Sequence, residues 1–520
     1  MSRVGDVGSA RDGHAPASSN RLLLITPMAL EARALAGAAP QLQIIRSGVG
    51  PRRARRAASA LAQHPAAAVA IAGFAGALDD GLEPGQLVVA SELLSASGSV
   101  LARCDGAGLI GGVLARAGLQ VRVGPIVSVR APVVGAARRR ALARTGALVA
   151  DMESAWLAAA AAGRPFAVVR AVLDTPTREL WSPAALLGGA RSASRSLRAA
   201  ATALAGWARA VAPRELVLAA PRASCAGVER AIDVVERTLD QYGPPVYMRK
   251  QIVHNRHVVA ELERRGAICV EELEEVPDGA TVVFSAHGVS PRVRQQAQAK
   301  ELNVIDATCP LVGKVHAEAR RFAKAGYTIV LIGHDGHEEI EGTAGEAPER
   351  IRLIADADEV DTLEVEDPNR VAYLTQTTLA VDETAGVVKR LRERFPNIVG
   401  PRSDDICYAT QNRQDAVRAL AERCEVILVV GSRNSSNSNR LVEVARRQGV
   451  RAHLVDDESQ IDPAWLHGVR RVGVTAGASS PERIVQRLVR ALRVLGELQI
   501  SEHAVARETV RFAPPREVRA

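Results

Sequence analysis

The chain has 520 residues, of which 47% are hydrophobic and 24% are charged, with 42 Gly and 26 Pro. That length exceeds what one hydrophobic core usually organises, and the ordinary globular composition excludes extended disorder, so two or more domains are expected. The formal net charge of +8 is modest and scattered, and aromatic residues make up only 3%, which argues against nucleic-acid binding.

The first twenty residues, 1–20, are rich in Ser, Gly, Asp and Arg and are expected to form a flexible tail. They have no apolar core of the kind that a secretory signal needs, and no later stretch is apolar over the length of a membrane span. The alanine-rich stretch around Ala158 is interrupted by Arg164 and therefore indicates packed helices. These features predict a cytoplasmic protein with no membrane span.

Residues 21–212 alternate short apolar runs with amphipathic helical patterns. The runs, in chain order, are LLLIT, IIRSGVG, AAVAIAGFAGAL, LVVAS, VGPIVSV, ALVADMES and FAVVRAVLD. Apolar runs separated by such helices predict an α/β domain with a mainly parallel sheet. A long helix from about Pro183 to Val211 is expected to close this domain.

The alternation restarts after Pro213 with the apolar run ELVLAAP, so a second domain is expected over residues 213–520. Further strands are predicted at VVFSAHG, VIDATCP, TIVLIGHDG, VAYLTQT, EVILVVGS and RVGVTAG. Polar residues follow several of these strands, and ligands of open α/β sheets bind at the carboxyl ends of strands. Cys225, Cys309 and Cys407 are spaced by about the length of one small α/β lobe. Three lobes are therefore expected, at about 226–308, 309–400 and 401–495, followed by a C-terminal tail.

Six cysteines occur in the chain, at positions 104, 225, 269, 309, 407 and 424, with no CxxC pair. In a chain expected to be cytoplasmic, a disulfide framework is improbable. By spacing alone, ordinary buried thiols are the commoner explanation. If Cys225, Cys309 and Cys407 do converge, three thiolates without a fourth suit an iron-sulfur cluster with one open iron. A zinc site completed by a histidine is the alternative.

The segment from Glu215 to the C-terminus carries nine motifs in one order: PRASCAGVERA, IVHNRHVV, FSAHGVS, DATCPLVGKVH, IGHDGHEEIEGT, LTQTTL, DDICYATQNRQ, VGSRNSSNSNRL and VTAGASSP. In these motifs it resembles the 4-hydroxy-3-methylbut-2-enyl diphosphate reductases of the IspH or LytB type. The resemblance implies a three-lobed (trefoil) α/β iron-sulfur reductase with a [4Fe–4S] cluster on Cys225, Cys309 and Cys407. The implied reaction is reductive dehydroxylation to isopentenyl and dimethylallyl diphosphate, the last step of the non-mevalonate pathway. A zinc-bound or metal-free diphosphate-binding module is the rival.

The same resemblance implies roles for ten further residues. Those that fall where the family holds the substrate diphosphate are His254, His287, Ser435, Asn437 and Ser479. His337, Glu339 and Thr377 fall where it handles the substrate hydroxyl, with Glu339 as the proton source, because hydroxide leaves carbon easily only when protonated or metal-bound. Thr378 and Ser436 are expected as additional contacts. Reduced ferredoxin or flavodoxin is the expected electron donor.

The sequence departs from this family at two places. Ala223 and Ser224 stand where Gly-Phe usually precedes the first cysteine, and Lys250 stands where a histidine is common. Cys269 and Cys424 match no ligand position and are interpreted as buried thiols.

The first half carries PMALEARAL, SGVGP, AGFAGALDDGLEPGQLVVAS, GPIVSV, VADMESAW and FAVVRAVLD. In these it resembles the purine nucleoside phosphorylase and methylthioadenosine nucleosidase superfamily, most closely the hopanoid-associated phosphorylase branch. The resemblance implies that Glu153 holds the ribose hydroxyls, Asp174 is the acid near the base and Glu31 is the glutamate after the first strand. The turn at 47–50 is a candidate cradle for phosphate or the attacking water. Phosphorolysis, hydrolysis of a nucleoside-type substrate and a non-catalytic scaffold all remain open.

Overall fold

The computed structural model describes residues 22–39, 42–179 and 183–519. The tail expected at residues 1–20 lies outside these ranges. Contacts divide the chain into two compact units, and each is described by itself. The first unit comprises the chain up to Pro213 together with residues 458–468 and 489–498; the second comprises Arg214–Asp457, Val469–Leu488 and the chain from Gln499 onward. Within the described ranges, every helix is too short or too polar to traverse a lipid bilayer.

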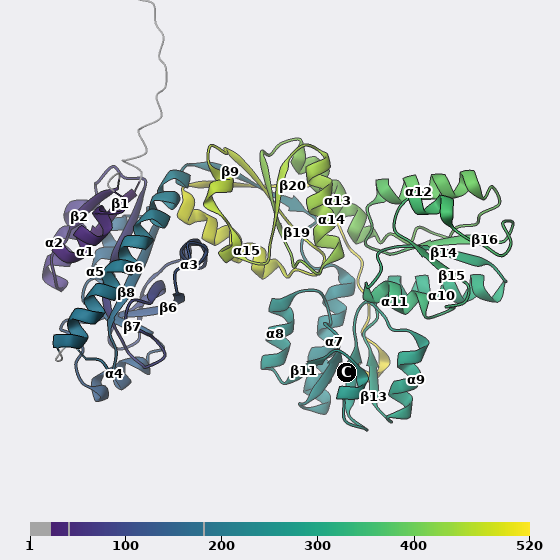
Figure 1. Ribbon diagram of the computed structural model, residues 1–520, viewed down its shortest axis with the longest axis horizontal. Coiled ribbons are helices and arrows are strands. Elements are labelled where there is room, and N and C mark those ends of the chain that lie inside the picture. The colour runs from purple at the N-terminus through teal and green to yellow at the C-terminus, as the bar shows by residue number, and fades with distance from the viewer. Residues whose placement is uncertain (1–21, 40–41, 180–182, 520) are drawn as a thin grey trace, which may run out of the picture. The chain divides into compact units, whose positions relative to one another are not determined.

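The first unit is built on one eight-stranded sheet (Figure 1). Its strands are β1 (Leu22–Thr26), β2 (Gln43–Arg46), β3 (Ala68–Ala77), β4 (Leu87–Leu94), β5 (Val100–Arg103), β6 (Val121–Ser128), β7 (Val149–Asp151) and β8 (Phe166–Asp174). Its helices are α1 (Ala29–Ala36), α2 (Pro51–Leu61), α3 (Ala107–Arg116), α4 (Ala136–Ala143), α5 (Ser154–Leu157) and α6 (Pro183–Ala210).

The sheet order is β2-β1-β3-β7-β6-β4-β5, with β8 pairing both β3 and β4. The strands β1, β2, β3 and β8 pair in parallel, as expected, but β3 with β7, β4 with β5 and β4 with β8 are antiparallel. The sheet is therefore mixed. Nearly every residue of β3 is buried, which is why its sequence is continuously apolar rather than alternating.

The second unit contains three separate sheets (Figure 1). The first has the order β11 (Ala267–Val270), β10 (Val246–Arg249), β12 (Thr281–Phe284), β13 (Asn303–Asp306), and the second has β15 (Ile351–Ile354), β14 (Thr328–Ile332), β16 (Val371–Thr375). The third has β18 (Arg451–Val455), β17 (Val426–Val430), β19 (Arg471–Ala476), β9 (Arg214–Ala220), β20 (Leu498–Ala504). All pairs in the first two sheets are parallel.

Helices cover these sheets: α7 (Ala226–Tyr242), α8 (Arg256–Arg264), α9 (Pro291–Ala299), α10 (Pro310–Lys324), α11 (Glu338–Ala344), α12 (Val381–Arg394), α13 (Tyr408–Ala421), α14 (Ser436–Arg447) and α15 (Glu482–Leu492). Alternate strand residues face two separate cores, as in the first sheet, where Val283 and Ile305 pack on one side and Val282 and Phe284 on the other. Strand β9 comes first in the sequence but pairs with β19 of the third sheet. The chain therefore leaves the third sheet at Ala220 and enters the first sheet's helix α7 through the loop that holds Cys225.

Candidate functional site

Three cysteines from the three parts of the second unit meet at one cavity of about 100 Å³, here called the cysteine pocket. Cys225, Cys309 and Cys407 are the N-cap residues of α7, α10 and α13. A Cβ atom placed on Gly227 would lie 2.7 Å from the Cys309 sulfur and 3.8 Å from that of Cys225. Both sulfurs therefore lie close to Gly227, where a larger residue would collide with Cys309. The cysteine pocket is thus assembled from segments more than eighty residues apart.

The chemistry of this donor set fits an iron-sulfur cluster. Burial and the charges of the other two thiolates raise the pKa of Cys309 to about 12, and burial and Cys225 raise that of Cys407 to about 11. Thiolates so close to one another need a cation to be stable together, which a cluster supplies. The N-terminus of a helix at each cysteine also favours negative charge. No fourth cysteine lines the cavity among the described residues, so a [4Fe–4S] cluster held here would have one iron without a cysteine ligand.

Three imidazoles form one wall of the cysteine pocket. The rings of His254 and His287 stack at 4.1 Å between centroids, and His337 meets them edge-on at 5.5 and 5.9 Å. Both ring nitrogens of His254 are buried without a hydrogen-bond partner in the described part of the chain. Burial, then His287, lowers the pKa of His254 to about 2 and that of His337 to about 4. Buried donors without partners are rare, so this wall suits a ligand that carries hydrogen-bond acceptors.

Glu338, which the sequence did not single out, fixes His287. Its carboxylate lies 3.0 Å from His287 Nδ1 and accepts from Ser285 Oγ at 3.3 Å. Burial raises its pKa, but the hydrogen bond and charge of His287 outweigh burial and bring it down to about 2. The carboxylate therefore holds a proton on Nδ1 and turns Nε2 of His287 to other partners. Ligand atoms of Glu338, His254 and His287 lie within 4.8 Å of one another.

Glu339 is the buried carboxyl of the cysteine pocket, only 2% exposed. Its two oxygens accept from the backbone N–H of Thr377 at 2.7 Å and from Thr377 Oγ1 at 3.0 Å. Burial raises its pKa despite these hydrogen bonds. A buried carboxyl with a raised pKa retains a proton more readily than one in water, as a general acid must.

Hydroxyl and amide side chains form another part of the lining. Ser435 Oγ lies 3.2 Å from Ser479 Oγ, which donates to the His254 carbonyl at 3.1 Å, and Thr378 Oγ1 donates to Ser436 Oγ at 3.0 Å. The structure thus brings all thirteen residues predicted for this site around one cavity: Cys225, His254, His287, Cys309, His337, Glu339, Thr377, Thr378, Cys407, Ser435, Ser436, Asn437 and Ser479.

Thr410 and Phe512 are among the lining residues that the sequence did not indicate. Thr410 Oγ1 lies 3.1 Å from the Cys407 sulfur and accepts from Asn437 Nδ2 at 3.2 Å, so it links a cysteine to the amide wall. Its position one turn into α13 was a signal, because side chains three residues apart on a helix lie on one face. Phe512 lines the cavity from the C-terminal segment, which carried no recognisable pattern.

A second cavity, of about 160 Å³ and here called the carboxylate pocket, lies in the first unit and is lined by Glu31, Glu153 and Asp174. Glu31 is 1% exposed, and its carboxylate accepts from Met28 N at 2.6 Å, Phe74 N at 2.7 Å and Thr26 Oγ1 at 3.0 Å. These donors satisfy both oxygens of Glu31 within the protein.

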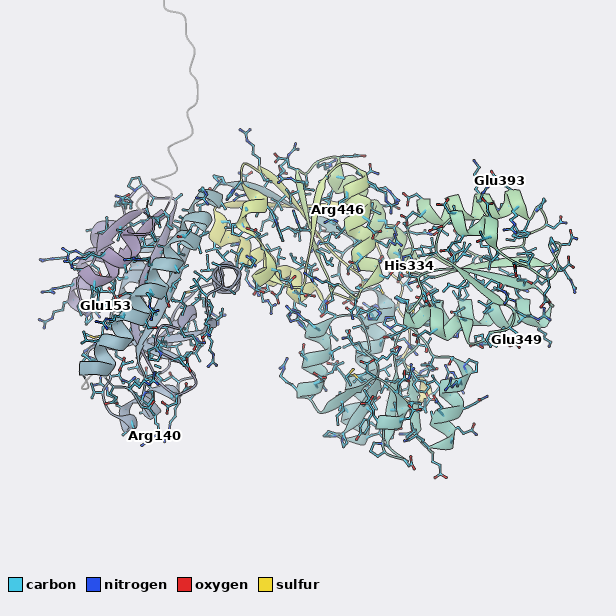
Figure 2. The ribbon with its side chains drawn as sticks, in the orientation of Figure 1. Arg140, Glu153, His334, Glu349, Glu393 and Arg446 are labelled. Carbon is cyan, nitrogen blue, oxygen red and sulfur yellow. The ribbon has the colours of Figure 1, made fainter. Side chains whose placement is uncertain are left out.

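Glu153 lies in the same unit at the start of α5 (Figure 2). Its Oε1 accepts from the backbone N–H of Gly50 at 2.9 Å, and its Oε2 lies 3.8 Å from Arg170, which also pairs with Asp151 at 2.6 Å. Burial raises the pKa of Glu153, although Arg170 opposes it. The sequence suggested that the turn at 47–50 cradles phosphate or water. In the structure the Gly50 N–H of this turn donates to the Glu153 carboxylate instead.

Asp174 forms a buried ion pair with Arg139 of α4, another residue that the sequence did not indicate. Burial raises the pKa of Asp174, and Arg139 works against this. Gly76 makes room for the pair, since a Cβ there would lie 2.9 Å from Asp174 Oδ1. Gly73 likewise makes room for Glu31 and Arg170, since a Cβ there would lie 2.7 Å from Glu31 Oε1 and 2.4 Å from Arg170 Nη1. These close approaches explain the small residues of the AGFAGAL motif.

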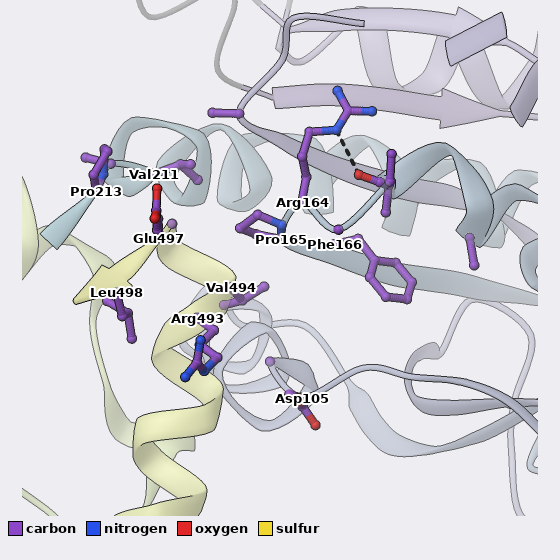
Figure 3. A pocket seen from close by; sticks show the side chains of 18 of the residues that line it. Asp105, Arg164, Pro165, Phe166, Val211, Pro213, Arg493, Val494, Glu497 and Leu498 are labelled. Carbon is purple, nitrogen blue, oxygen red and sulfur yellow. Dashed lines mark hydrogen bonds between the residues drawn. The ribbon is translucent and has the colours of Figure 1, made fainter. Parts of the chain in front are cut away.

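Another cavity of the first unit, of about 1030 Å³, carries none of the predicted site residues (Figure 3). Residues 158–159, 161–166 and 493–494 line much of it. Arg164 donates from Nε to the Ala161 carbonyl at 2.8 Å, and its guanidinium donates to the carbonyls of Leu61 and Ala66 at 3.0 and 3.1 Å. The guanidinium of Arg164 is thus used to bind backbone carbonyls of neighbouring segments.

Comparisons with known proteins agree with this division. Residues 216–493 match the family described as LytB protein, and residues 38–205 match the phosphorylase superfamily. The chain is 57% identical over 307 residues to 4-hydroxy-3-methylbut-2-enyl diphosphate reductase of Nocardia farcinica, covering 59% of this chain and 91% of that protein. It is 58% identical over 308 residues to the protein of the same name from Mycolicibacterium paratuberculosis, covering 59% and 93%.

A solved structure, that of the E-1-hydroxy-2-methyl-but-2-enyl-4-diphosphate reductase from Plasmodium falciparum, aligns with a TM-score of 0.57 at 39% identity. It covers 59% of this chain and 97% of its own. The fusion of a phosphorylase-like α/β part with a LytB-like α/β part, inferred from the motifs, is confirmed. Since the matched region spans more than half of the sequence, the chain belongs to the LytB family, whose enzymes are [4Fe–4S] proteins.

Proposed function

We propose that the second unit converts 4-hydroxy-3-methylbut-2-enyl diphosphate to isopentenyl and dimethylallyl diphosphate. Two electrons and two protons enter, the bond from carbon to the hydroxyl oxygen breaks, and the oxygen leaves as water. The observation that carries the proposal is the cysteine pocket itself, in which three thiols, a buried carboxyl and three imidazoles line one cavity, and both ring nitrogens of His254 lack a partner among the described residues. The names of the relatives at 57% and 58% identity support it.

In this proposal the imidazole and hydroxyl walls bind the diphosphate. His254, His287, Ser435, Asn437 and Ser479 all line the cavity, and all five side chains offer donors to phosphate oxygens. The negative ligand favours the protonated form of the imidazoles, so charge-assisted hydrogen bonds replace the missing partners of His254. Glu338 keeps His287 oriented for this task through its Nδ1.

The hydroxyl end of the substrate lies, in this proposal, beside Glu339, His337 and Thr377. Glu339 holds the proton that departs with the oxygen, and Thr377 fixes the carboxyl through two hydrogen bonds. His337 Nδ1 accepts from the backbone N–H of Glu339 at 3.2 Å, so its Nε2 is the nitrogen left to donate. When bound to Cys225, Cys309 and Cys407, a [4Fe–4S] cluster supplies electrons and a Lewis-acidic iron for the substrate oxygen.

The electron donor in this proposal is a reduced ferredoxin or flavodoxin. Such proteins are commonly acidic, and the formal charge of +8 favours association with an acidic partner. Turnover supported by either protein, with a lower rate at high ionic strength, is the expected result.

For the first unit we propose cleavage of the N-glycosidic bond of an adenosine-type nucleoside. The carboxylate pocket supports this, because Glu31, Glu153 and Asp174 line one cavity of a phosphorylase-like domain. Glu153 binds the ribose hydroxyls and Asp174 interacts with the departing base. Water is the favoured nucleophile, since the backbone N–H of Gly50, in the turn that was the candidate phosphate cradle, already donates to Glu153. An adenosylated hopane is the proposed substrate by the resemblance to the hopanoid-associated branch.

Two assays test these proposals. Anaerobically purified protein with a chemical reductant should convert the hydroxylated diphosphate to the two products, and a protein that holds the cluster but leaves this substrate unchanged would refute the first. Release of adenine from adenosine analogues, with and without phosphate, tests the second. No release under either condition would leave the first unit as a scaffold.

A further inference from the structure

Each cluster cysteine is followed on its own helix by a basic residue that reaches toward a different cysteine. These residues are Arg230 on α7, Lys314 on α10 and Arg413 on α13, which come five, five and six residues after Cys225, Cys309 and Cys407. At that spacing the basic side chain lies about one and a half helical turns from the cysteine. Each of them contacts backbone carbonyls of the loop that precedes the next cysteine.

Arg230, on the helix that follows Cys225, contacts the loop that precedes Cys309. Its Nη1 donates to the carbonyls of Ala307 and Thr308 at 3.0 and 3.1 Å, the two residues directly before Cys309. Its Nε donates to the carbonyl of Ala513 at 2.8 Å, in the segment that brings Phe512 to the cavity.

Lys314, on the helix that follows Cys309, contacts the loop that precedes Cys407. Its Nζ donates to the carbonyls of Ser403 and Asp404 at 2.6 and 2.8 Å and lies 3.2 Å from Asp405 Oδ1. Asp405 Oδ2 in turn accepts from the backbone N–H of Thr375 at 3.1 Å. The loop that leads into Cys407 is therefore joined to α10 on one side and to β16 on the other.

Arg413, on the helix that follows Cys407, contacts the loop that precedes Cys225, and this contact closes the cycle. It is 0% exposed, and its Nε and Nη2 donate to the carbonyl of Ala223 at 3.0 and 2.6 Å. Ala223 has φ 62°, a left-handed conformation that is unfavourable for alanine. The two hydrogen bonds from Arg413 help to hold Ala223 in this conformation.

We propose that Arg230, Lys314 and Arg413 form a closed ring of positioning residues, each joining the helix of one cluster cysteine to the loop of the next. The contacts run in a single cyclic order, from Cys225 to Cys309 to Cys407 and back. The ring holds the three loops together from outside the cavity, so each sulfur is in place before a cluster binds. Lys314 and Arg413 are paired with Asp405 and Glu508, so removal of either cation would leave a carboxylate uncompensated near the thiolates and disfavour the reduced, more negative cluster.

Variants at Lys314 and Arg230 test the ring, with matched controls on the same helices. Lys314→Met is compared with Lys324→Met on α10, where Lys324 is exposed. Arg230→Met is compared with Arg237→Met on α7, where Arg237 is 41% exposed and pairs with Asp233. Iron and sulfide content, iron release to a chelator and the midpoint potential of the cluster are measured for each protein.

The ring predicts iron release about tenfold faster or more in Lys314→Met and Arg230→Met than in their controls, because charged hydrogen bonds to two carbonyls are lost. The midpoint potential shifts negative in both. Lys314→Arg, which keeps the charge, retains the potential even if its geometry slows cluster assembly. In the variant that combines Lys314→Met and Arg230→Met, the second substitution accelerates iron release less than it does alone, because one break in the ring already loosens every loop.

Unchanged iron release and potential in Lys314→Met and Arg230→Met would overturn the ring. If either variant fails to fold, hydrogen exchange on metal-free wild-type protein decides: slow exchange at 305–309 and 403–409 supports a preformed site, and exchange as fast as in an exposed loop refutes it. The inference rests on the proposed cluster site and not on the substrate. A protein that keeps its cluster but does not reduce the diphosphate would refute the proposed function and leave the ring intact.

Discussion

The cysteine pocket and the carboxylate pocket satisfy their polar groups in different ways. In the cysteine pocket both ring nitrogens of His254 are buried without a hydrogen-bond partner among the described residues. In the carboxylate pocket Glu31 accepts three hydrogen bonds, Glu153 accepts from Gly50, and Asp174 pairs with Arg139. A ligand of the first pocket completes hydrogen bonds that the protein lacks, whereas a ligand of the second must compete with contacts that already exist.

The two pockets also differ in how they are assembled. The cysteine pocket collects residues from three sheets, while the carboxylate pocket draws its residues from one sheet and the helices beside it. A site between lobes depends on the loops that join them, which is where the ring of basic residues acts. A site on one sheet is fixed by the sheet itself.

The largest effect is expected from removing a cluster ligand. Cys309→Ser should abolish the cluster and reductive turnover, because two thiolates cannot hold it, while adenine release by the first unit continues. Iron and sulfide analysis with both assays checks this. Cys269→Ser, in β11 and outside the cavity, is the control. Full cluster content in Cys309→Ser would break the assignment of the pocket.

Glu339→Gln should lower kcat for the diphosphate by about 10²–10⁴ without loss of the cluster, because the proton donor is lost. Since burial raises the pKa of Glu339 above its ordinary value of 4.5, the wild-type rate should fall as pH rises through that raised pKa, and the variant should lose this dependence. Glu349→Gln, an exposed position shown in Figure 2, serves as control. An unchanged kcat in Glu339→Gln would exclude the role.

In the first unit, Glu153→Gln should reduce adenine release by about 10²-fold or more, the size expected when an electrostatic contact to the reacting sugar is lost. Steady-state assays with an adenosine analogue check this, with Glu83→Gln at an exposed position as control. The rate of diphosphate reduction should not change. Equal adenine release by Glu153→Gln and the wild type would favour the scaffold alternative.

The histidine wall predicts an acid dependence of stability. The folded pKa of His254 is about 2 and that of His337 about 4, both below the ordinary 6.5, so below pH 6.5 the unfolded chain binds protons that the folded one does not. Each imidazole then lowers the free energy of unfolding by up to about 1.4 kcal/mol per pH unit as pH falls from 6.5 toward its folded pKa. Denaturant unfolding of metal-free protein between pH 7 and 5 should show this decline, with a shallower slope in His254→Asn. Identical slopes would contradict the burial of a neutral imidazole.

The smallest effect concerns Ala223. Glycine adopts φ 62° without strain, so Ala223→Gly should raise the stability of the second unit by roughly 0.5–1 kcal/mol. Thermal unfolding checks the sign. Destabilisation by this substitution would mean that the alanine side chain contributes packing that outweighs the backbone strain.

The sequence predicted most of the fold because apolar runs at regular intervals specify parallel α/β structure. Positions after strand ends allowed Cys225, Cys309 and Cys407 to converge, but the motif resemblance was needed to prefer a shared site over ordinary buried thiols. The sequence did not predict that β9 pairs with β19, or that β7 runs antiparallel to β3, because strand partners are chosen by tertiary packing. It also missed ion-pair partners such as Arg139 and Glu338. Arg170 carried a usable signal, since a charge inside the buried strand FAVVRAVLD is rare unless paired.

Three distant thiols are proposed to hold one cluster in a pocket that reduces a hydroxylated diphosphate. Metal and sulfide analysis of anaerobically purified protein, combined with reductive turnover of that substrate, tests this proposal most directly. We predict a brown protein with iron and inorganic sulfide in equal amounts that forms both isopentenyl and dimethylallyl diphosphate. A colourless protein that contains zinc, or no metal, and leaves the substrate unchanged would contradict the account.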